Sequence, residues 1–435
     1  MTMTADKPNL TLEDINLIEP RIFGEKPPHD QWKLLREQDP VRWHDGWQQT
    51  EDGEVAPFRG FWSITKYDDI IRISRDPETF ISSRGIVIGT EPESATAAAG
   101  LGKMLITMDP PRHVRLRRLV NKGFTPRAVV AFESEIRRYT SEILDDFCQK
   151  DTCDFVTEVA AILPLAVICG MMGIAKEDWG KMFALTNKVL GASDPEFQDE
   201  VAGDIEDVAE RRRVIEATVM QGNIEMFQYF GQSIAAHREA GKDDLVQTLI
   251  DSKVDGEPLT DEEILFFCYL LILAGNETTR NAISGGMLAF FENPDQLQKL
   301  RANPALLPSA TEEILRYISP VTHMTRAATR DTELRGKQIK TGDKVALWYP
   351  SANRDAHVFP DADTFNIERS PNDHLAFGIG EHFCLGAGFA RMEISVMFEE
   401  LLKRFSKLEQ DGPAERLASN FIGGIKHMPV KYTRA

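Results

Sequence analysis

A single cysteine in a glycine-rich loop constrains this chain more than any other sequence feature. The stretch Phe-Gly-Ile-Gly-Glu-His-Phe-Cys-Leu-Gly runs from Phe377 to Gly386 and contains Cys384. Glycines let the backbone turn tightly and bring N–H groups close to the sulfur. The apolar run after Cys384 predicts a helix whose positive N-terminal end faces the sulfur. Both effects favour the anion, so the loop predicts a cysteine thiolate that binds a metal.

The loop sequence by itself leaves other roles for Cys384 open. A lone cysteine is usually a small buried hydrophobe. A zinc site would need three or four Cys or His ligands at short spacing, and His382 with Cys384 supplies only two. A cysteine nucleophile would need a base and an orienting group, which the sequence does not exclude. The rest of the chain has to decide between these roles.

Two further motifs, together with the cysteine loop, make the chain resemble the cytochrome P450 superfamily. Glu313 and Arg316 fit its helical Glu-x-x-Arg signature, and Arg369 fits the third member of that ion-pair cluster. The segment Ala-Gly-Asn-Glu-Thr-Thr at 274–279 fits its oxygen-side helix. The resemblance implies a mainly α fold with small β-sheets, in which haem b lies between a long central helix and the cysteine loop. Cys384 is then expected to be the axial iron ligand, whose thiolate favours O–O cleavage.

The oxygen-side helix has clear start and stop signals. Thr260 followed by Glu263 predicts a capping box, and helical character persists to about Phe291 before Asn-Pro stops it. The segment 274–279 is a polar and flexible interruption of this apolar run. A glycine inside a helix costs about 1 kcal/mol, and a threonine can bend the helix by bonding back to an earlier carbonyl. A solvated or kinked turn is the plain alternative to a functional role.

The resemblance assigns chemistry to this interruption. Ala274 and Gly275 are expected to border a groove that opens space for dioxygen beside the haem. Thr278 is expected to hold dioxygen by a hydrogen bond, and Glu277 to relay protons from solvent. These two are the predicted catalytic residues.

A second helix is predicted to help hold the haem. Asp-Pro-Pro opens it at 109–111, and His113 and Arg117 lie four residues apart and therefore share a face. Two donor groups on one face suit a propionate, and the resemblance adds Arg326 and His382 as further propionate partners. Each alone could be an ordinary surface charge. The residues expected around the cofactor are therefore His113, Arg117, Ala274, Gly275, Arg326, Phe377, His382, Cys384 and Gly386.

Composition narrows the class of protein and its surroundings. The chain has 435 residues, 42% hydrophobic and 27% charged, which is enough for a large core. A net charge of -18 disfavours nucleic acid and anionic membranes as partners. The five cysteines form no framework of spacings, which favours a reducing compartment, and we expect a cytoplasmic protein. The start lacks a signal peptide's apolar core, and the longest apolar run, 264–274, is too short to span a bilayer.

The organisation along the chain shows no linker or repeat. Length alone would suggest two or three domains, but the resemblance, from about Trp62 to the C-terminus, implies a single domain over 1–435. We expect a polar, Pro-rich N-terminal arm at 1–60 and a catalytic unit at 61–435. Within the unit, 61–64 predicts a strand, 86–102 a loop and 111–250 mostly helix. Strand signals recur at 329–345 and after 417.

The predicted activity is insertion of one oxygen atom of O₂ into an unactivated C–H bond, with the other reduced to water. No flavin- or nicotinamide-binding extension follows the cysteine loop, so a separate ferredoxin and its reductase are implied. Two rivals are an electron-transfer or sensor haem protein and a peroxide-driven relative, neither of which needs the Glu277–Thr278 pair. A cysteine hydrolase, which needs no haem, is the third.

The expected substrate is a large apolar molecule. Several motifs resemble bacterial enzymes that oxidise steroid side chains, branched lipids or terpenes. The resemblance brings four segments together over the haem, and their side chains form an apolar wall typical of a ligand cavity. His323 is the polar residue in this apolar wall. It could anchor a polar group of the substrate, but we favour a core histidine whose ring nitrogens have partners within the protein. The expected substrate contacts are Ile86, Val87, Ile88, Leu273, Val321, Met324, Phe421 and Ile422.

A basic patch is predicted to receive the ferredoxin. With His113 and Arg117 turned toward the haem, a spacing of about 100° per residue puts other cations of that helix on the opposite face. An ordinary solvated face is the alternative. The predicted patch consists of Arg115, Arg118 and Lys122, with Arg112 at its edge.

Overall fold

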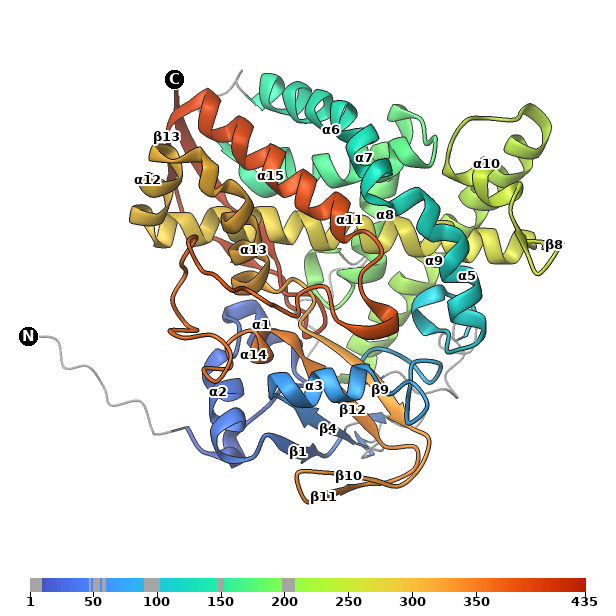
Figure 1. Cartoon of the computed structure of the whole chain (residues 1–435), viewed down its shortest axis with the longest axis vertical. Coiled ribbons are helices and arrows are strands. Elements are labelled where there is room, and N and C mark those ends of the chain that lie inside the picture. Colours follow the sequence, from blue (N-terminus) through green and yellow to red (C-terminus); the bar gives the residue numbers. More distant parts are fainter. Residues whose placement is uncertain are drawn as a thin grey trace, which may run out of the picture.

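A long helix, α11 (Asp261–Glu292), crosses the middle of the fold (Figure 1). The predicted capping box is present, because the Glu263 N–H donates to the Thr260 hydroxyl and the Thr260 N–H donates to the Glu263 carboxylate. The helix has 32 residues, which gives a length of about 48 Å. It ends at the predicted stop, Asn293. The expected central helix of about thirty residues is therefore confirmed.

Several of the other helices pack on α11. The computed structural model describes residues 10–46, 48–49, 55–56, 60–89, 102–147, 152–197 and 208–435. None of the helices in these ranges is long and apolar enough to cross a membrane. The helices confirm the predicted mainly α fold. They are α1 (Pro20–Glu25), α2 (His29–Gln38), α3 (Tyr67–Ser74), α5 (Arg112–Val120), α6 (Pro126–Phe147), α7 (Ile162–Met171), α8 (Trp179–Leu190), α9 (Val208–Ala240), α10 (Leu245–Ile250), α12 (Pro294–Ala302), α13 (Leu307–Ile318), α14 (Tyr349–Ala352) and α15 (Ala387–Arg404).

A five-stranded mixed sheet lies below α11 in Figure 1. Its order is β1 (Val41–His44), β4 (Phe61–Ile64), β12 (Lys344–Trp348), β9 (His323–Ala328) and β5 (Phe80–Ile81). Strands β4 and β12 run parallel, and the other neighbours are antiparallel. Side chains alternate along a strand, so Met324 and Arg326 of β9 point to the same face. The sheet thereby places an apolar and a cationic candidate next to each other.

Smaller sheets confirm the remaining strand signals. One contains β13 (Phe405–Gln410), β16 (Pro429–Arg434) and β6 (Thr152–Asp154). Two-stranded pairs are β10 (Thr332–Leu334) with β11 (Lys337–Ile339), β14 (Glu415–Arg416) with β15 (Ile425–His427), β7 (Lys253–Val254) with β8 (Glu257–Pro258), and β2 (Gln48–Gln49) with β3 (Val55–Ala56). Of the predicted loop, 86–89 has no helix or strand, and 90–101 lies outside the described residues.

The described part of the N-terminal segment is not a tethered arm. Trp32 of α2 is fully buried, and its ring lies 6.0 Å from Phe23 and 5.6 Å from Trp348 of the sheet. Leu17 and Leu35 are buried in the same cluster. Aromatic side chains of this size contribute much of the apolar area that a core removes from water. The expectation of an arm fails here because these few apolar residues, scattered in a polar stretch, all find places against the sheet.

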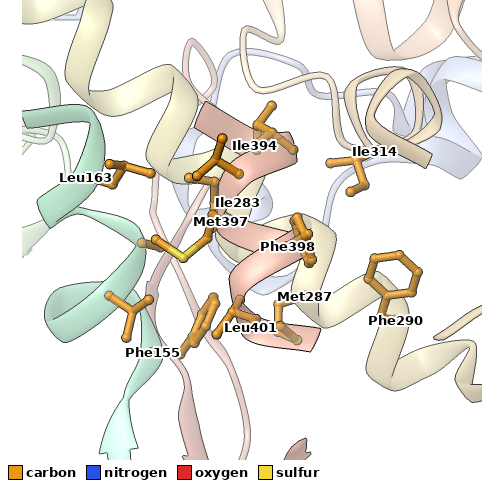
Figure 2. Packing of buried hydrophobic residues seen from close by; sticks show 14 of the residues in the cluster. Phe155, Leu163, Ile283, Met287, Phe290, Ile314, Ile394, Met397, Phe398 and Leu401 are labelled. Atoms are coloured by element: carbon orange, nitrogen blue, oxygen red, sulfur yellow. The ribbon is translucent and has the colours of Figure 1, made fainter. Parts of the chain in front are cut away.

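The main hydrophobic core lies where α13 and α15 pack on α11 (Figure 2). Figure 2 shows Met397 of α15 beside Ile283 of α11. A Cβ atom at Gly286 would lie 2.9 Å from the Ile314 side chain of α13. The missing side chain therefore lets α13 approach α11 closely. This packing fixes the helix that leads into the Glu-x-x-Arg motif.

The Glu-x-x-Arg motif forms a fully buried ion-pair cluster. Arg316 donates to both Glu313 carboxylate oxygens at 2.7 and 2.8 Å, and Arg369 donates from Nε at 3.1 Å. Arg316 also donates to the carbonyls of Asn353 and Ala362. Its three expected members meet, and their spare N–H groups hold the chain that precedes the cysteine loop.

Candidate active site

The cysteine loop is held in a tight shape by its own backbone. The Cys384 N–H donates to the Phe377 carbonyl at 2.9 Å, and the Phe383 N–H donates to the Gly380 carbonyl at 3.1 Å. Gly380 has a φ of 80°, and a Cβ there would lie 2.4 Å from the Ser74 carbonyl oxygen of α3. Only glycine fits this position. The loop therefore turns where the sequence predicted.

The surroundings of Cys384 contain groups that favour its thiolate, although burial opposes them. Burial raises the pKa of the Cys384 thiol, while the Gly386 and Ala387 N–H groups and the guanidinium groups of Arg117 and Arg391 lower it. By contrast, burial raises the pKa of Cys268 to about 12 with no cation to offset it. A bound cation would favour the Cys384 thiolate further. Within the described ranges no three His, Cys, Asp or Glu side chains gather as a metal site, so a zinc site at Cys384 finds no support.

Three of the expected propionate partners, His113, Arg326 and His382, lie close together, and His113 has ring nitrogens without partners within the described residues. The rings of His113 and His382 are 4.2 Å apart. His113 is 1% exposed, and neither ring nitrogen has a partner within the described residues. Burial and Arg117 lower the pKa of His113 to about 4, and burial and Arg326 lower that of His382 to about 2. Buried donors without partners are costly, so this cluster fits the carboxylates of a haem.

Arg117 makes a different contact from the one expected. It donates to the Phe383 carbonyl at 2.6 Å and to the Asn121 side chain at 3.0 Å. It therefore ties α5 to the cysteine loop directly. Its expected role toward a propionate stays a prediction, because the hydrogen bonds to Phe383 and Asn121 account for the position of its guanidinium group.

The middle of α11 is open on one side. Ala274 is exposed, and Gly275 and Thr278 are half-exposed, although the side chains around them are buried. The Thr278 hydroxyl donates to the Ala274 carbonyl at 2.8 Å, which is the back-bond expected of a threonine here. The helix nevertheless continues without a break. A Cβ at Gly275 would lie 3.3 Å from Ile168, so this glycine also lets α7 pack closely.

Glu277 faces away from solvent, which the sequence did not indicate. It is 1% exposed and forms an ion pair with Arg280, and burial raises the pKa of its carboxyl while Arg280 opposes that. Arg280 donates further to the Asn187 side chain of α8 at 3.1 Å. The i, i+3 spacing of Glu277 and Arg280 could have suggested the pair. Its partner on α8 had no sequence signal.

The expected substrate segments meet through backbone contacts. The Thr325 N–H donates to the Ile86 carbonyl at 2.7 Å, and the Thr322 N–H donates to the Phe421 carbonyl at 3.0 Å. Val321 and Ile422 form an isolated bridge. Side chains of Ile86, Val87, Val321, Met324 and Phe421 are half-exposed, whereas Ile422 and Leu273 are buried. Leu273 packs with α7, α8 and α9 residues rather than with these segments.

His323 is a satisfied core histidine rather than a substrate anchor. It is fully buried, and its Nδ1 lies 2.9 Å from the Asn420 carbonyl. Its Nε2 accepts from the Ile88 N–H at 3.2 Å. Burial lowers the pKa of His323 to about 4, so the ring is neutral at pH 7. Both ring nitrogens are used by the backbone, which leaves none for a ligand.

Comparisons with known proteins settle the family. The sequence profile named cytochrome P450 matches residues 59–432. The chain belongs to the cytochrome P450 family. This P450 is 40% identical to the methyl-branched lipid omega-hydroxylase of Mycobacterium tuberculosis, over 92% of this chain and 90% of that protein. It is 37% identical to the steroid C26-monooxygenase of the same organism, over 99% of this chain and 95% of that protein.

Solved structures agree with the family and its fold. The P450 CYP268A2 of Mycobacterium marinum, in complex with pseudoionone, matches with a TM-score of 0.85 and 31% identity. That match covers 98% of this chain and 100% of the other. The protein is thus a P450 monooxygenase that binds haem b. The bound haem supplies oxygen activation, and the residues around Cys384 and His113 fit it.

Replacing Cys384 tests the assignment of the iron ligand. Cys384→Ala is expected to abolish the red-shifted Soret band of the reduced CO complex, because no other thiolate lies in the loop. The measurement is the CO difference spectrum of the purified protein. Cys169→Ala, which removes a fully buried cysteine of α7, is the matched control and should keep the band. If the Cys384 variant kept the same red shift, the assignment would be wrong.

Proposed function

We propose that this P450 hydroxylates a large apolar molecule, such as a steroid, a terpenoid or a branched lipid, with O₂ and electrons from a ferredoxin. The observation that carries the proposal is the apolar wall formed by segments 86–88, 321–324 and 421–422, which hydrogen bonds hold together. Its side chains are apolar apart from Thr322 and His323, whose polar groups bond to backbone atoms. Such a lining favours a ligand with few polar groups.

The relatives support the same substrate class. Two of them are named for a methyl-branched lipid and a steroid. Among similar structures, one P450 holds pseudoionone, and CYP109E1 of Bacillus megaterium holds testosterone. These molecules are bulky and mainly hydrocarbon.

A ligand screen tests the substrate class. We expect testosterone, pseudoionone or a methyl-branched fatty acid to give a low-to-high-spin shift, measured by optical titration. Ile86→Glu should weaken the best ligand at least about tenfold, because it places a charge in the apolar wall. Val130→Glu, at a position 64% exposed on α6, is the control and should bind normally. A spin shift only with small charged aromatics would contradict the proposal.

Thr278 and Glu277 are proposed to deliver protons to the oxygen substrate. Thr278 stands at the open turn of α11, and its hydroxyl must turn from the Ala274 carbonyl in order to donate elsewhere. Glu277 lies behind it with one carboxylate oxygen, Oε1, unpartnered within the described residues. Arg280 holds the other carboxylate oxygen. A proton from solvent therefore reaches Thr278 either through the Glu277–Arg280 ion pair or after the Glu277 side chain has rotated. The raised pKa of a buried carboxyl suits a proton donor.

Removing the Thr278 hydroxyl tests this role. Thr278→Ala is expected to keep haem and ligand binding but to cut product formed per NAD(P)H consumed about tenfold or more, with hydrogen peroxide released instead. Product and peroxide are measured together in the reconstituted system. Ser284→Ala removes a similar hydroxyl-to-carbonyl bond farther along α11 and should stay coupled. If Thr278→Ala formed as much product per NAD(P)H as the wild type, the role would be wrong. A peroxide-driven relative would give that result.

The ferredoxin is proposed to dock beside the cysteine loop, on a smaller patch than predicted. Arg112 and Arg115 are paired, with Glu263 at 3.1 Å and Asp255 at 2.6 Å. Arg118 is exposed without an ion pair within the described residues, as is Lys122. Arg118 also borders a surface hollow with His113 and Arg117 instead of lying opposite them.

Apolar side chains complete this docking surface. Val114 is 37% and Phe383 41% exposed. An apolar centre with cations at its edge resembles the arrangement of protein interfaces. Phe383 precedes Cys384, so a partner here would sit over the iron ligand. A cytoplasmic location, where such partners are found, stays a prediction.

Charge reversal tests the docking surface. Arg118→Glu combined with Lys122→Glu is expected to slow haem reduction by an acidic ferredoxin about tenfold at low salt and to flatten its salt dependence. Stopped-flow spectroscopy measures the rate. Arg138→Glu, on the exposed face of α6, is the control. It reverses one charge away from the docking surface and should leave the reduction rate unchanged. An unaltered rate in the double variant would remove this surface from consideration.

A further inference from the structure

A cavity with both polar and apolar walls lies beside the C-terminal half of α11, between that helix and the N-terminal segment. Its volume is about 160 Å³. Its walls come from α1, α2, α11, the end of α13, α14 and the loops around 354 and 424. Figure 1 shows α1 and α14 next to each other below α13. We call this space the α2–α11 cavity, and it has room for a benzene-sized molecule or several waters.

Buried polar atoms without partners line the α2–α11 cavity. Trp32 is fully buried and its indole N–H has no acceptor within the described residues. Asn281 is 1% exposed, and both its amide nitrogen and its amide oxygen lack partners there. The Nη1 of Arg354, 5% exposed, and the Nδ1 of His29 are likewise unpartnered. Buried polar groups of this kind nearly always have partners in folded proteins. Four side chains with unpartnered polar atoms around one cavity therefore indicate that a ligand or water binds there.

The charge around the cavity favours an anion. Arg354 and Arg416 both line it, and Glu292 is the acid among its lining residues. Arg354 has Asp363 only at 3.7 Å, and that carboxylate is 65% exposed. Burial and Arg354 lower the pKa of His29 well below its usual range, so its ring is neutral. The lining therefore has a net positive charge and several free donors.

The rest of the lining sets the shape of the occupant. Phe23, Leu288 and Ile318 contribute apolar walls. A bare inorganic anion would leave these walls against water, whereas a carboxylate with a short apolar body would contact both kinds of surface. Trp32 and Arg354 would donate to its oxygens, since indole and guanidinium N–H groups are donors only.

We propose that the α2–α11 cavity is a second ligand site, which takes a small carboxylate with a short apolar body. It is separate from the cysteine loop, and of the apolar-wall segments it touches Thr322 alone. It meets the oxygen-side helix at Asn281, one turn beyond Thr278. A ligand here contacts the same helix that carries the catalytic threonine, and so it can alter that helix without entering the haem pocket.

Benzoate is a suitable probe because it has one carboxylate and a compact ring. We expect it to bind the haem-loaded protein with one site in calorimetry. Trp32→Phe keeps the ring but loses the donor, and it should weaken binding about tenfold, as should Asn281→Leu, which fills the space. Trp43→Phe removes an exposed indole N–H that donates to Asp45 and should leave affinity unchanged. Equal affinity in wild type and both cavity variants, or no binding, would overturn the proposal.

Crystals of the wild-type protein grown with 4-bromobenzoate give a test that needs no variant. An anomalous bromine peak between Trp32 and Asn281 supports the site. A peak only in the haem pocket, or none at a concentration that saturates the protein in solution, overturns it. In that case the cavity holds water alone.

Discussion

The buried Glu313 carboxylate is the constraint on which the rest of the site depends. It is fully enclosed, so it needs the two arginines that surround it. Removing one partner of such a pair is far more costly than the pair is worth in net stability. The arginines use their remaining N–H groups on carbonyls at 353, 360–362 and 364. One buried charge thereby fixes a long irregular segment just ahead of the cysteine loop.

Helix α11 serves as a wall for several regions at once. Its middle turn borders the open side at Thr278, its buried faces form the core with α13 and α15, and its last turns border the α2–α11 cavity. A helix that is apolar on nearly all sides is stable only when buried. Glu277 and Arg280 therefore satisfy each other inside the protein.

Local signals in the sequence predicted the parts that depend on neighbouring residues. The capping box at Thr260, the back-bond of Thr278 and the meeting of Glu313 with Arg316 all involve residues three or four apart. Contacts between distant segments were out of reach, such as Arg280 with Asn187 and Arg115 with Asp255. The N-terminal segment shows the same limit, since its buried residues are few and become a core only against the sheet.

The two hydrogen bonds of His323 have a consequence for the evolution of specificity. One imidazole ring joins strand β9 to the backbone at 88 and to the tail at 420. The three stretches of the apolar wall are thus mechanically linked, and a shift in one is passed to the others. Effects of substitutions in contact are generally not additive. A new substrate preference should therefore arise from combinations of changes whose order matters, with His323 retained as the joint between them.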